Sequence, residues 1–146
     1  MRPTLPVADL EALVVRLSGL TARREGFSRT AAATLTRLAG SAPTRLTELA
    51  AAEGVSQPSM SSLVARLVDQ GLVHRGRDPQ DARVVLLSLT PDGEALVAQR
   101  RADRTARLDR ALSDLSPDDV ARIAAAVPAL NRLADALRRS PEEVTR

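Results

Sequence analysis

One regular apolar stripe constrains this chain more than any other feature of its sequence. Five apolar residues recur at i, i+3, i+4, i+7 and i+8: Met60, Leu63, Val64, Leu67 and Val68. This spacing is typical of one buried face of an α-helix. Ser56 is a good N-cap before the stripe, and Gly71 is a good stop after it. The sequence therefore predicts a helix that begins at Gln57, ends by Gly71 and buries only one of its faces.

The opposite face of this helix carries short polar side chains and one arginine. Its candidate DNA-contacting residues are Gln57, Pro58, Ser59, Ser61, Ser62 and Arg66. Short polar side chains allow a helix backbone to approach base edges in the major groove of DNA. The alternative for the serines is an ordinary solvated face, so the neighbouring elements have to decide between the two interpretations.

The segments on either side of this helix favour DNA binding. Before it, Leu46, Leu49 and Ala50 share one side of a short helix, residues 47–53, and Gly54 suits the left-handed turn that follows. After it, residues 72–75 and 84–89 are rich in Val and Leu and predict two strands, joined by a polar turn. The order helix, turn, capped helix and hairpin is the layout of a winged helix-turn-helix.

Arginines gather at the predicted hairpin, at positions 75, 77 and 83. A narrow minor groove concentrates negative potential and attracts an inserted arginine, and phosphate contacts add salt-dependent affinity. We therefore identify Arg75, Arg77 and Arg83 as wing residues, with Asp81 orienting Arg83 through a charge-assisted hydrogen bond. Asp78 and Asp81 also offset the basic charge, so the loop is not simply a basic patch, and a solvated loop is the alternative.

Long helices are predicted on both sides of this region. Apolar spacing and capping signals place them at residues 7–24, 28–39, 91–115 and 117–139, with Pro128 kinking the last one. The fold class is mainly α with a small β-hairpin wing. Residues 1–40 are expected to form N-terminal scaffold and dimerisation helices, residues 41–90 the winged helix-turn-helix, and residues 91–146 the C-terminal dimerisation helices.

The terminal helices carry more apolar surface than a small monomer can bury. These residues are Leu10, Leu13, Leu17, Val120, Ile123, Val127, Leu130 and Leu137. A large exposed apolar patch marks an interaction site. We expect this patch to be the interface of a homodimer.

The composition excludes several other classes of protein. The 146 residues include no cysteine and one histidine, so thiol redox chemistry, thiolate zinc sites and most nucleophilic enzyme designs lack their components. There is no Gly-rich phosphate loop, no membrane-spanning segment and no signal peptide, so we expect a cytoplasmic protein that is not an enzyme and has no cofactor. The net charge of +3, with arginine as the only basic residue besides His74, allows nucleic-acid binding but equally reflects a GC-rich genome.

Residues 46–90 resemble the core of the MarR family of regulators. The most specific piece is Arg77-Asp78-Pro79-Gln80-Asp81-Ala82-Arg83, followed in register by Leu89 and Thr90. The resemblance implies an obligate homodimer that binds palindromic double-stranded DNA, usually as a repressor. It also implies that Arg83 enters the minor groove while Asp81 holds it, and that a small aromatic or anionic effector releases the DNA in many members.

Some features depart from the family pattern or stay open. The family's ligand pockets are often lined by aromatic residues, whereas this chain has only Phe27, for which a core role is expected, and the lack of cysteine excludes the thiol-oxidation branch. A winged helix that binds proteins without DNA is the alternative function. The arginines between positions 100 and 110 form either an anion-binding face or a solvated face paired with acids. His74 is either a pH sensor or a structural residue near the DNA.

Overall fold

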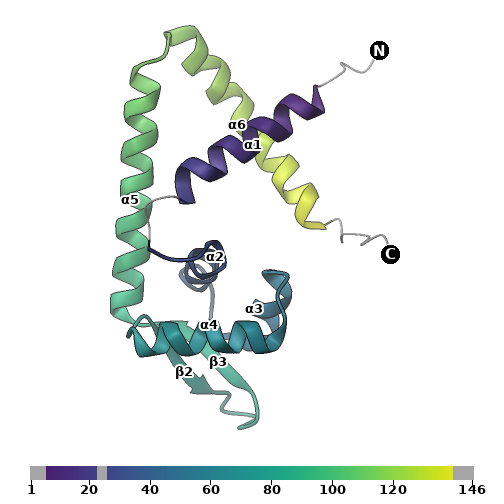
Figure 1. Cartoon of the computed structure of the whole chain (residues 1–146), viewed down its shortest axis with the longest axis vertical. Coiled ribbons are helices and arrows are strands. Elements are labelled where there is room, and N and C mark those ends of the chain that lie inside the picture. Colours follow the sequence, from purple (N-terminus) through teal and green to yellow (C-terminus); the bar gives the residue numbers. More distant parts are fainter. Residues whose placement is uncertain (1–5, 23–25, 140–146) are drawn as a thin grey trace. The chain divides into compact units, whose positions relative to one another are not determined.

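The computed structural model describes residues 6–22 and 26–139, which form two compact units. The first unit ends at Ala102 and the second begins at Asp103. The first unit contains α1 (Val7–Ala22), α2 (Arg29–Leu38), β1 (Thr44–Arg45), α3 (Leu46–Ala52), α4 (Gln57–Asp69), β2 (Val73–Arg77) and β3 (Val85–Leu89). The helix α5 (Pro91–Ser113) begins in the first unit and continues into the second, which also holds α6 (Pro117–Arg139). Figure 1 shows this order along the chain.

Side-chain caps start the helices where the sequence predicts them. The hydroxyl of Ser28 accepts a hydrogen bond from the Ala31 amide (3.2 Å), and that of Ser56 accepts one from the Ser59 amide (3.3 Å). The Ser116 hydroxyl accepts one from the Asp119 amide at the start of α6 (3.1 Å). Each cap satisfies an amide that would otherwise lack a partner in the first turn.

Two glycines set the turns at the ends of α4. Gly54 has φ +63° and Gly71 has φ +71°, a region that side chains with a Cβ rarely adopt. Gly54 turns the chain between α3 and α4, and the Val55 amide then donates to the Ala50 carbonyl (3.0 Å). The angle between the two helices of the helix-turn-helix therefore depends on a backbone conformation that glycine supplies.

The sheet has three strands in the order β1-β3-β2, with both pairs antiparallel. The two hairpin strands were predicted, but each is shifted: the first runs from Val73 to Arg77 and the second begins at Val85. The third strand, β1, was not predicted, because its two residues are too few to show an alternating pattern. It pairs Arg45 with Leu86 and so joins the start of α3 to the wing.

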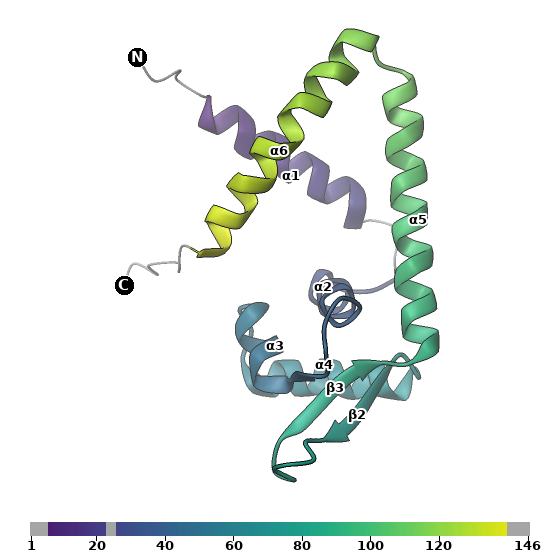
Figure 2. The same ribbon diagram turned by 180° about the vertical axis from the view of Figure 1, so that it is seen from behind.

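The core of the first unit lies where α2, α3, α4 and the sheet meet (Figure 2). Its largest apolar side chains are at most 1% exposed and are Leu35, Leu49, Met60, Val64, Leu67 and Leu87. Three of these six come from the predicted stripe on α4. The burial of that stripe is therefore confirmed, and it requires the polar face of α4 to point away from the core.

Helices α1 and α6 each leave large apolar side chains exposed. On α1 these are Val7, Leu13, Val14, Val15 and Leu17, and on α6 they are Ile123, Val127, Leu130, Leu133 and Leu137. The exposed fraction of Leu137 reaches 67% and that of Val127 is 46%. The sequence predicted α6 to end near residue 139, as it does, whereas the predicted last turns of the first helix, residues 23–24, lie outside the described residues. None of the described helices combines the length and the apolar character needed to cross a membrane.

Thr34 provides a test of this packing. Its side chain is fully buried in α2, and its Oγ1 atom has no hydrogen-bond partner within the described residues. A buried hydroxyl without a partner costs about 1–3 kcal/mol, so we expect Thr34→Val to raise the free energy of unfolding by about 1 kcal/mol. Urea denaturation measures this change. Leu35→Ala in the same helix should lower stability by about 2–5 kcal/mol, and a clear loss of stability in Thr34→Val would contradict the prediction.

Candidate nucleic-acid interface

The outward face of α4 is the first component of the site. All six residues predicted for it are exposed, namely Gln57, Pro58, Ser59, Ser61, Ser62 and Arg66. The buried stripe fixes this outcome, since positions between the buried ones lie on the other side of a helix. The structure thus presents a 13-residue helix whose outer surface is made of short polar groups and one guanidinium.

Two of these serines bond within their own helix. The Ser62 hydroxyl donates to the Pro58 carbonyl (3.0 Å), and the hydroxyls of Ser59 and Ser56 lie 2.9 Å apart at the N-cap. Along the described chain, the side chains of Gln57, Ser61 and Arg66 make no hydrogen bond or ion pair. Gln57, Ser61 and Arg66 therefore keep their full hydrogen-bonding capacity for a ligand, whereas Ser59 and Ser62 offer mainly acceptor lone pairs.

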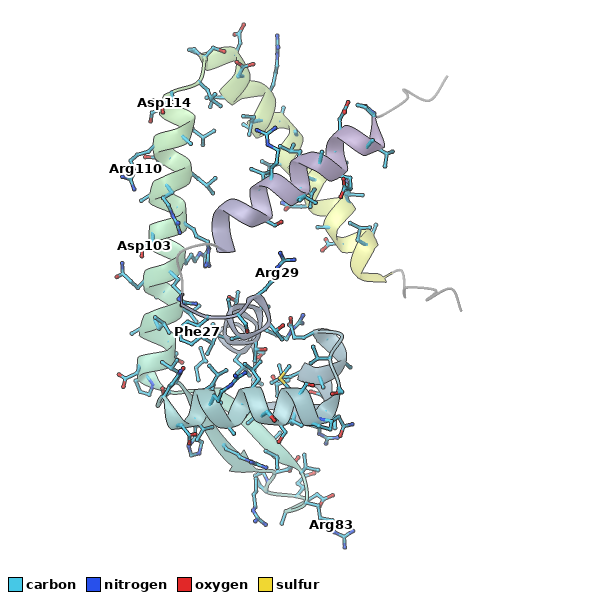
Figure 3. All side chains as sticks on the ribbon, in the orientation of Figure 1. Phe27, Arg29, Arg83, Asp103, Arg110 and Asp114 are labelled. Atoms are coloured by element: carbon cyan, nitrogen blue, oxygen red, sulfur yellow. The ribbon has the colours of Figure 1, made fainter. Side chains whose placement is uncertain are left out.

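The wing is the second component. Arg75, Arg77 and Arg83 are exposed, and Figure 3 shows the Arg83 side chain at the far tip of the hairpin, directed away from the core of its unit. A depression of about 500 Å³ separates the strand arginines from the tip. Its lining residues are Arg75, Gly76, Arg77, Ala82, Arg83 and Val85. Three of the six lining residues are arginines, so this part of the surface attracts anions.

Hydrogen bonds to the backbone hold the wing loop in shape. Asp81 Oδ1 accepts a hydrogen bond from the backbone amide of Arg83 (3.0 Å), and Asp78 Oδ1 accepts one from the amide of Gln80 (2.8 Å). Both are Asx turns, which mimic a backbone turn. The loop is closed at its neck by the Asp78 amide, which donates to the Val84 carbonyl (3.0 Å).

This geometry corrects the expected role of Asp81. The carboxylate orients Arg83, but through the main-chain amide and not through a charge-assisted bond to the guanidinium. Because the amide is held, the backbone at Arg83 is fixed, and its side chain points outward from the tip of the hairpin (Figure 3). The Arg77 guanidinium adds a hydrogen bond to the Ala82 carbonyl (3.3 Å), which supports the same loop from the strand side.

Arg45 belongs to the site although the sequence did not reveal it. Its Nη2 lies 3.9 Å from Asp78 Oδ2, and its backbone amide donates to Glu48 Oε2 at the start of α3 (3.3 Å). A partly exposed ion pair of this length contributes little stability. It does, however, connect α3 to the wing through β1. Only the strand β1 brings Arg45 close to the wing. A strand of two residues has no recognisable sequence pattern, so the sequence could not have indicated this position.

The structure bears on the two interpretations of the α5 arginines and on the expected role of Phe27. Phe27 packs against the core, as expected, and the Arg100 guanidinium lies over its ring, 4.3 Å from the ring centroid. Arg107 and Arg110 each donate through Nε to a carbonyl one turn earlier, those of Asp103 (3.3 Å) and Ala106 (3.2 Å). Intrahelical bonding of this kind is typical of a solvated helix face, the simpler of the two interpretations.

His74 lies on the other face of β2 from Arg75 and Arg77. It is exposed and pairs with Ser88 across the strands, whereas Arg75 pairs with Leu87. Successive residues of a strand point to opposite faces, so His74 is separated from the wing arginines. No group of three or more His, Asp or Glu side chains within the described ranges could hold a metal ion.

A small cavity of about 160 Å³ lies between the start of α2 and the inner side of α4. Its lining residues are Gly26, Phe27, Ser28, Ala31, Leu63, Arg66, Leu67 and Gln70. Ligand pockets for drug-sized molecules usually measure about 300–1,000 Å³. The cavity is therefore too small for such a molecule without rearrangement.

Sequence comparison with known proteins places this chain in a family. The model of the MarR family matches residues 27–85, the span from α2 to the start of β3. An uncharacterised HTH-type transcriptional regulator of Mycobacterium bovis is 36% identical over 118 residues, which cover 74% of this chain and 82% of the relative.

Solved structures share the fold of this chain. The crystal structure of RV1404 from Mycobacterium tuberculosis is similar with a TM-score of 0.76 and 24% identity, covering 90% of this chain and 96% of that one. Streptococcus pneumoniae FabT, solved in complex with DNA, is similar in fold with a TM-score of 0.63 and 19% identity, covering 90% and 92% of the two chains. With its winged helix, its wing sequence and these relatives, the chain belongs to the MarR family of transcriptional regulators.

Proposed function

We propose that this protein is a homodimeric repressor that binds a palindromic operator, with α4 in the major groove and the wing in the adjacent minor groove. The observation that carries the proposal is that the exposed polar face of α4 and the outward Arg83 belong to one compact unit. Gln57, Ser61 and Arg66 would meet base edges, and Arg83 would meet the negative potential of the minor groove. FabT, a protein of similar fold, has been solved with DNA, which supports DNA as the partner.

In this proposal the functional protein is a dimer of two identical chains. The exposed apolar side chains of α1 and α6 need a cover of similar character, and another copy of the same helices supplies one. Two copies related by a two-fold axis present two α4 helices, which would read half-sites about one helical turn apart. Selection of bound duplexes from random DNA identifies the operator and tests its symmetry.

Release of DNA by a small effector is a further part of the proposal. The 160 Å³ cavity beside Arg66 is below the size of an ordinary ligand pocket. The protein would act in the cytoplasm, where its DNA lies.

Arg83→Ala is the first test of DNA binding. Loss of an arginine from the minor groove should weaken binding to the selected operator by about tenfold or more. Arg110→Ala, which removes the same charge from α5, is the matched control and should leave the affinity within about twofold, because its guanidinium bonds to its own helix. Fluorescence anisotropy at fixed salt measures both. Equal effects of the two substitutions would favour a role that does not involve the wing.

Substitution of Asp81 is a test in which electrostatics and loop geometry predict opposite changes in operator affinity. Removing an acid near a polyanion should strengthen binding if charge alone matters. Because Asp81 fixes the Arg83 amide, we expect Asp81→Ala to weaken operator binding several-fold, whereas Asp81→Asn keeps the acceptor and should bind as well as the wild type or better. Anisotropy titrations decide it, and tighter binding by Asp81→Ala would show that the Asx turn is dispensable.

Val127→Glu tests the dimer. A carboxylate placed among the exposed apolar residues of α6 should shift the protein from dimer toward monomer at micromolar concentration, and operator binding should fall with it. Light scattering measures the mass. Ala125→Glu puts the same charge about 160° around the helix and is the control that should remain dimeric. A wild-type protein that is monomeric at these concentrations would end the dimer proposal.

A further inference from the structure

Thr90 joins the end of α4 to the beginning of α5. Its hydroxyl donates to the Gly71 carbonyl (2.6 Å), and its backbone amide donates to the Leu72 carbonyl (3.1 Å). The same hydroxyl oxygen accepts from the Gly93 amide (3.1 Å), so it is also the cap of α5. One residue thus links the two elements through a hydrogen bond between positions 19 apart in sequence.

The other side of this contact is held by α4 itself. The Gly71 amide donates to the Val68 carbonyl (2.8 Å), and the Leu72 amide donates to the Leu67 carbonyl (2.9 Å). With the positive φ of Gly71, these two bonds form a Schellman motif at the helix end. Gly71 and Leu72 therefore give their amides to α4 and their carbonyls to Thr90, which leaves little freedom between the two helices.

Gly93 fixes the separation of the same two elements. It is buried, and a Cβ atom built on it would collide with the carbonyl group of Leu72 and press on the Leu89 side chain. Its φ is not in the left-handed region, so the need for glycine here is one of space and not of backbone conformation. Any larger residue would have to push the first turn of α5 away from the end of α4.

From these contacts we infer that Thr90 and Gly93 are positioning residues, which set the orientation of α4 relative to the first turn of α5. A helix cap alone needs only the bond from Gly93 to Thr90. The additional donation from Thr90 to Gly71 lies outside the capping motif and makes the link to α4. The core decides which face of α4 points outward, and this contact then sets how that face, with Gln57, Ser61 and Arg66, is oriented relative to the first turn of α5. The geometric part of this inference stands without the proposed function, and its consequence for DNA rests on that function.

The contact of Thr90 and Gly93 with Gly71 and Leu72 is called the joint below. Distance measurements between spin labels test this joint without DNA. The chain has no cysteine, so Ala65→Cys in α4 and Ala98→Cys in α5, both at exposed positions, give one defined pair. Dilution with unlabelled protein restricts the measurement to pairs within one chain. We expect a narrow distance distribution in the otherwise wild-type protein and in Thr90→Ser, which keeps the hydroxyl, and a broader one in Thr90→Val, which loses it. An unchanged width in Thr90→Val would overturn the inference.

Two further variants separate positioning from general stability. Gly93→Ala should shift the mean of the distribution, because the added methyl group displaces α5 from Leu72. Leu38→Val removes buried volume from α2 and destabilises the core without touching the joint. It should leave the distribution narrow. A broadening in Leu38→Val equal to that in Thr90→Val would show that the effect is loss of stability alone.

The DNA readout uses the unlabelled variants. We expect Thr90→Val to lower the ratio of operator affinity to random-duplex affinity by about tenfold, the size expected when one base contact is lost, and Thr90→Ser to restore it. If Arg83→Ala weakens operator binding while Thr90→Val changes neither the ratio nor the label distances, the joint fails and the proposed function stands. If no duplex is preferred over any other, the proposed function fails, and the label distances still decide the joint.

Discussion

Burial of one face of α4 against α2, α3 and the sheet is the interaction on which the rest of this structure depends. Met60, Val64 and Leu67 are at most 1% exposed, and each fully buried side chain of this size contributes about 1.5–3 kcal/mol of transfer free energy. With these three positions held inside, helical geometry leaves no choice about which residues point outward. The polar face that we propose for DNA is thus a consequence of the packing of the core.

The same core also fixes the elements around α4. Leu87 of β3 is fully buried, so the hairpin is anchored at its base while its loop extends beyond it. The loop then keeps its shape because main-chain amides donate hydrogen bonds to the carboxylates of Asp78 and Asp81. An arginine-bearing loop that is ordered before binding loses less conformational entropy on contact with DNA than a flexible one would. The joint at Thr90 extends this order to the first turn of α5.

Much of the fold could be predicted because its signals are local. A cap such as Ser56 or Ser116 acts within three residues, and an apolar stripe such as that of α4 needs only one helix to reveal itself. The wing sequence from Arg77 to Arg83 likewise lies in one stretch of chain. The polar face of α4 and the exposed wing arginines could therefore be named from the sequence.

By itself, the sequence determined the helices, their caps, the hairpin, and which residues of α4 face away from the core, since each of these depends on neighbours within a few positions. Only the tertiary structure decided the strand β1 and the ion pair of Arg45 with Asp78. It also decided the hydrogen bond that Asp81 accepts from a main-chain amide and the one that the Thr90 hydroxyl donates to the Gly71 carbonyl. Apart from the Asp81 bond, these contacts join groups that are 19 to 43 positions apart, and a periodic pattern carries no information at that range. The direction of the Asp81 bond depends on the loop's backbone angles, which residue types alone do not specify.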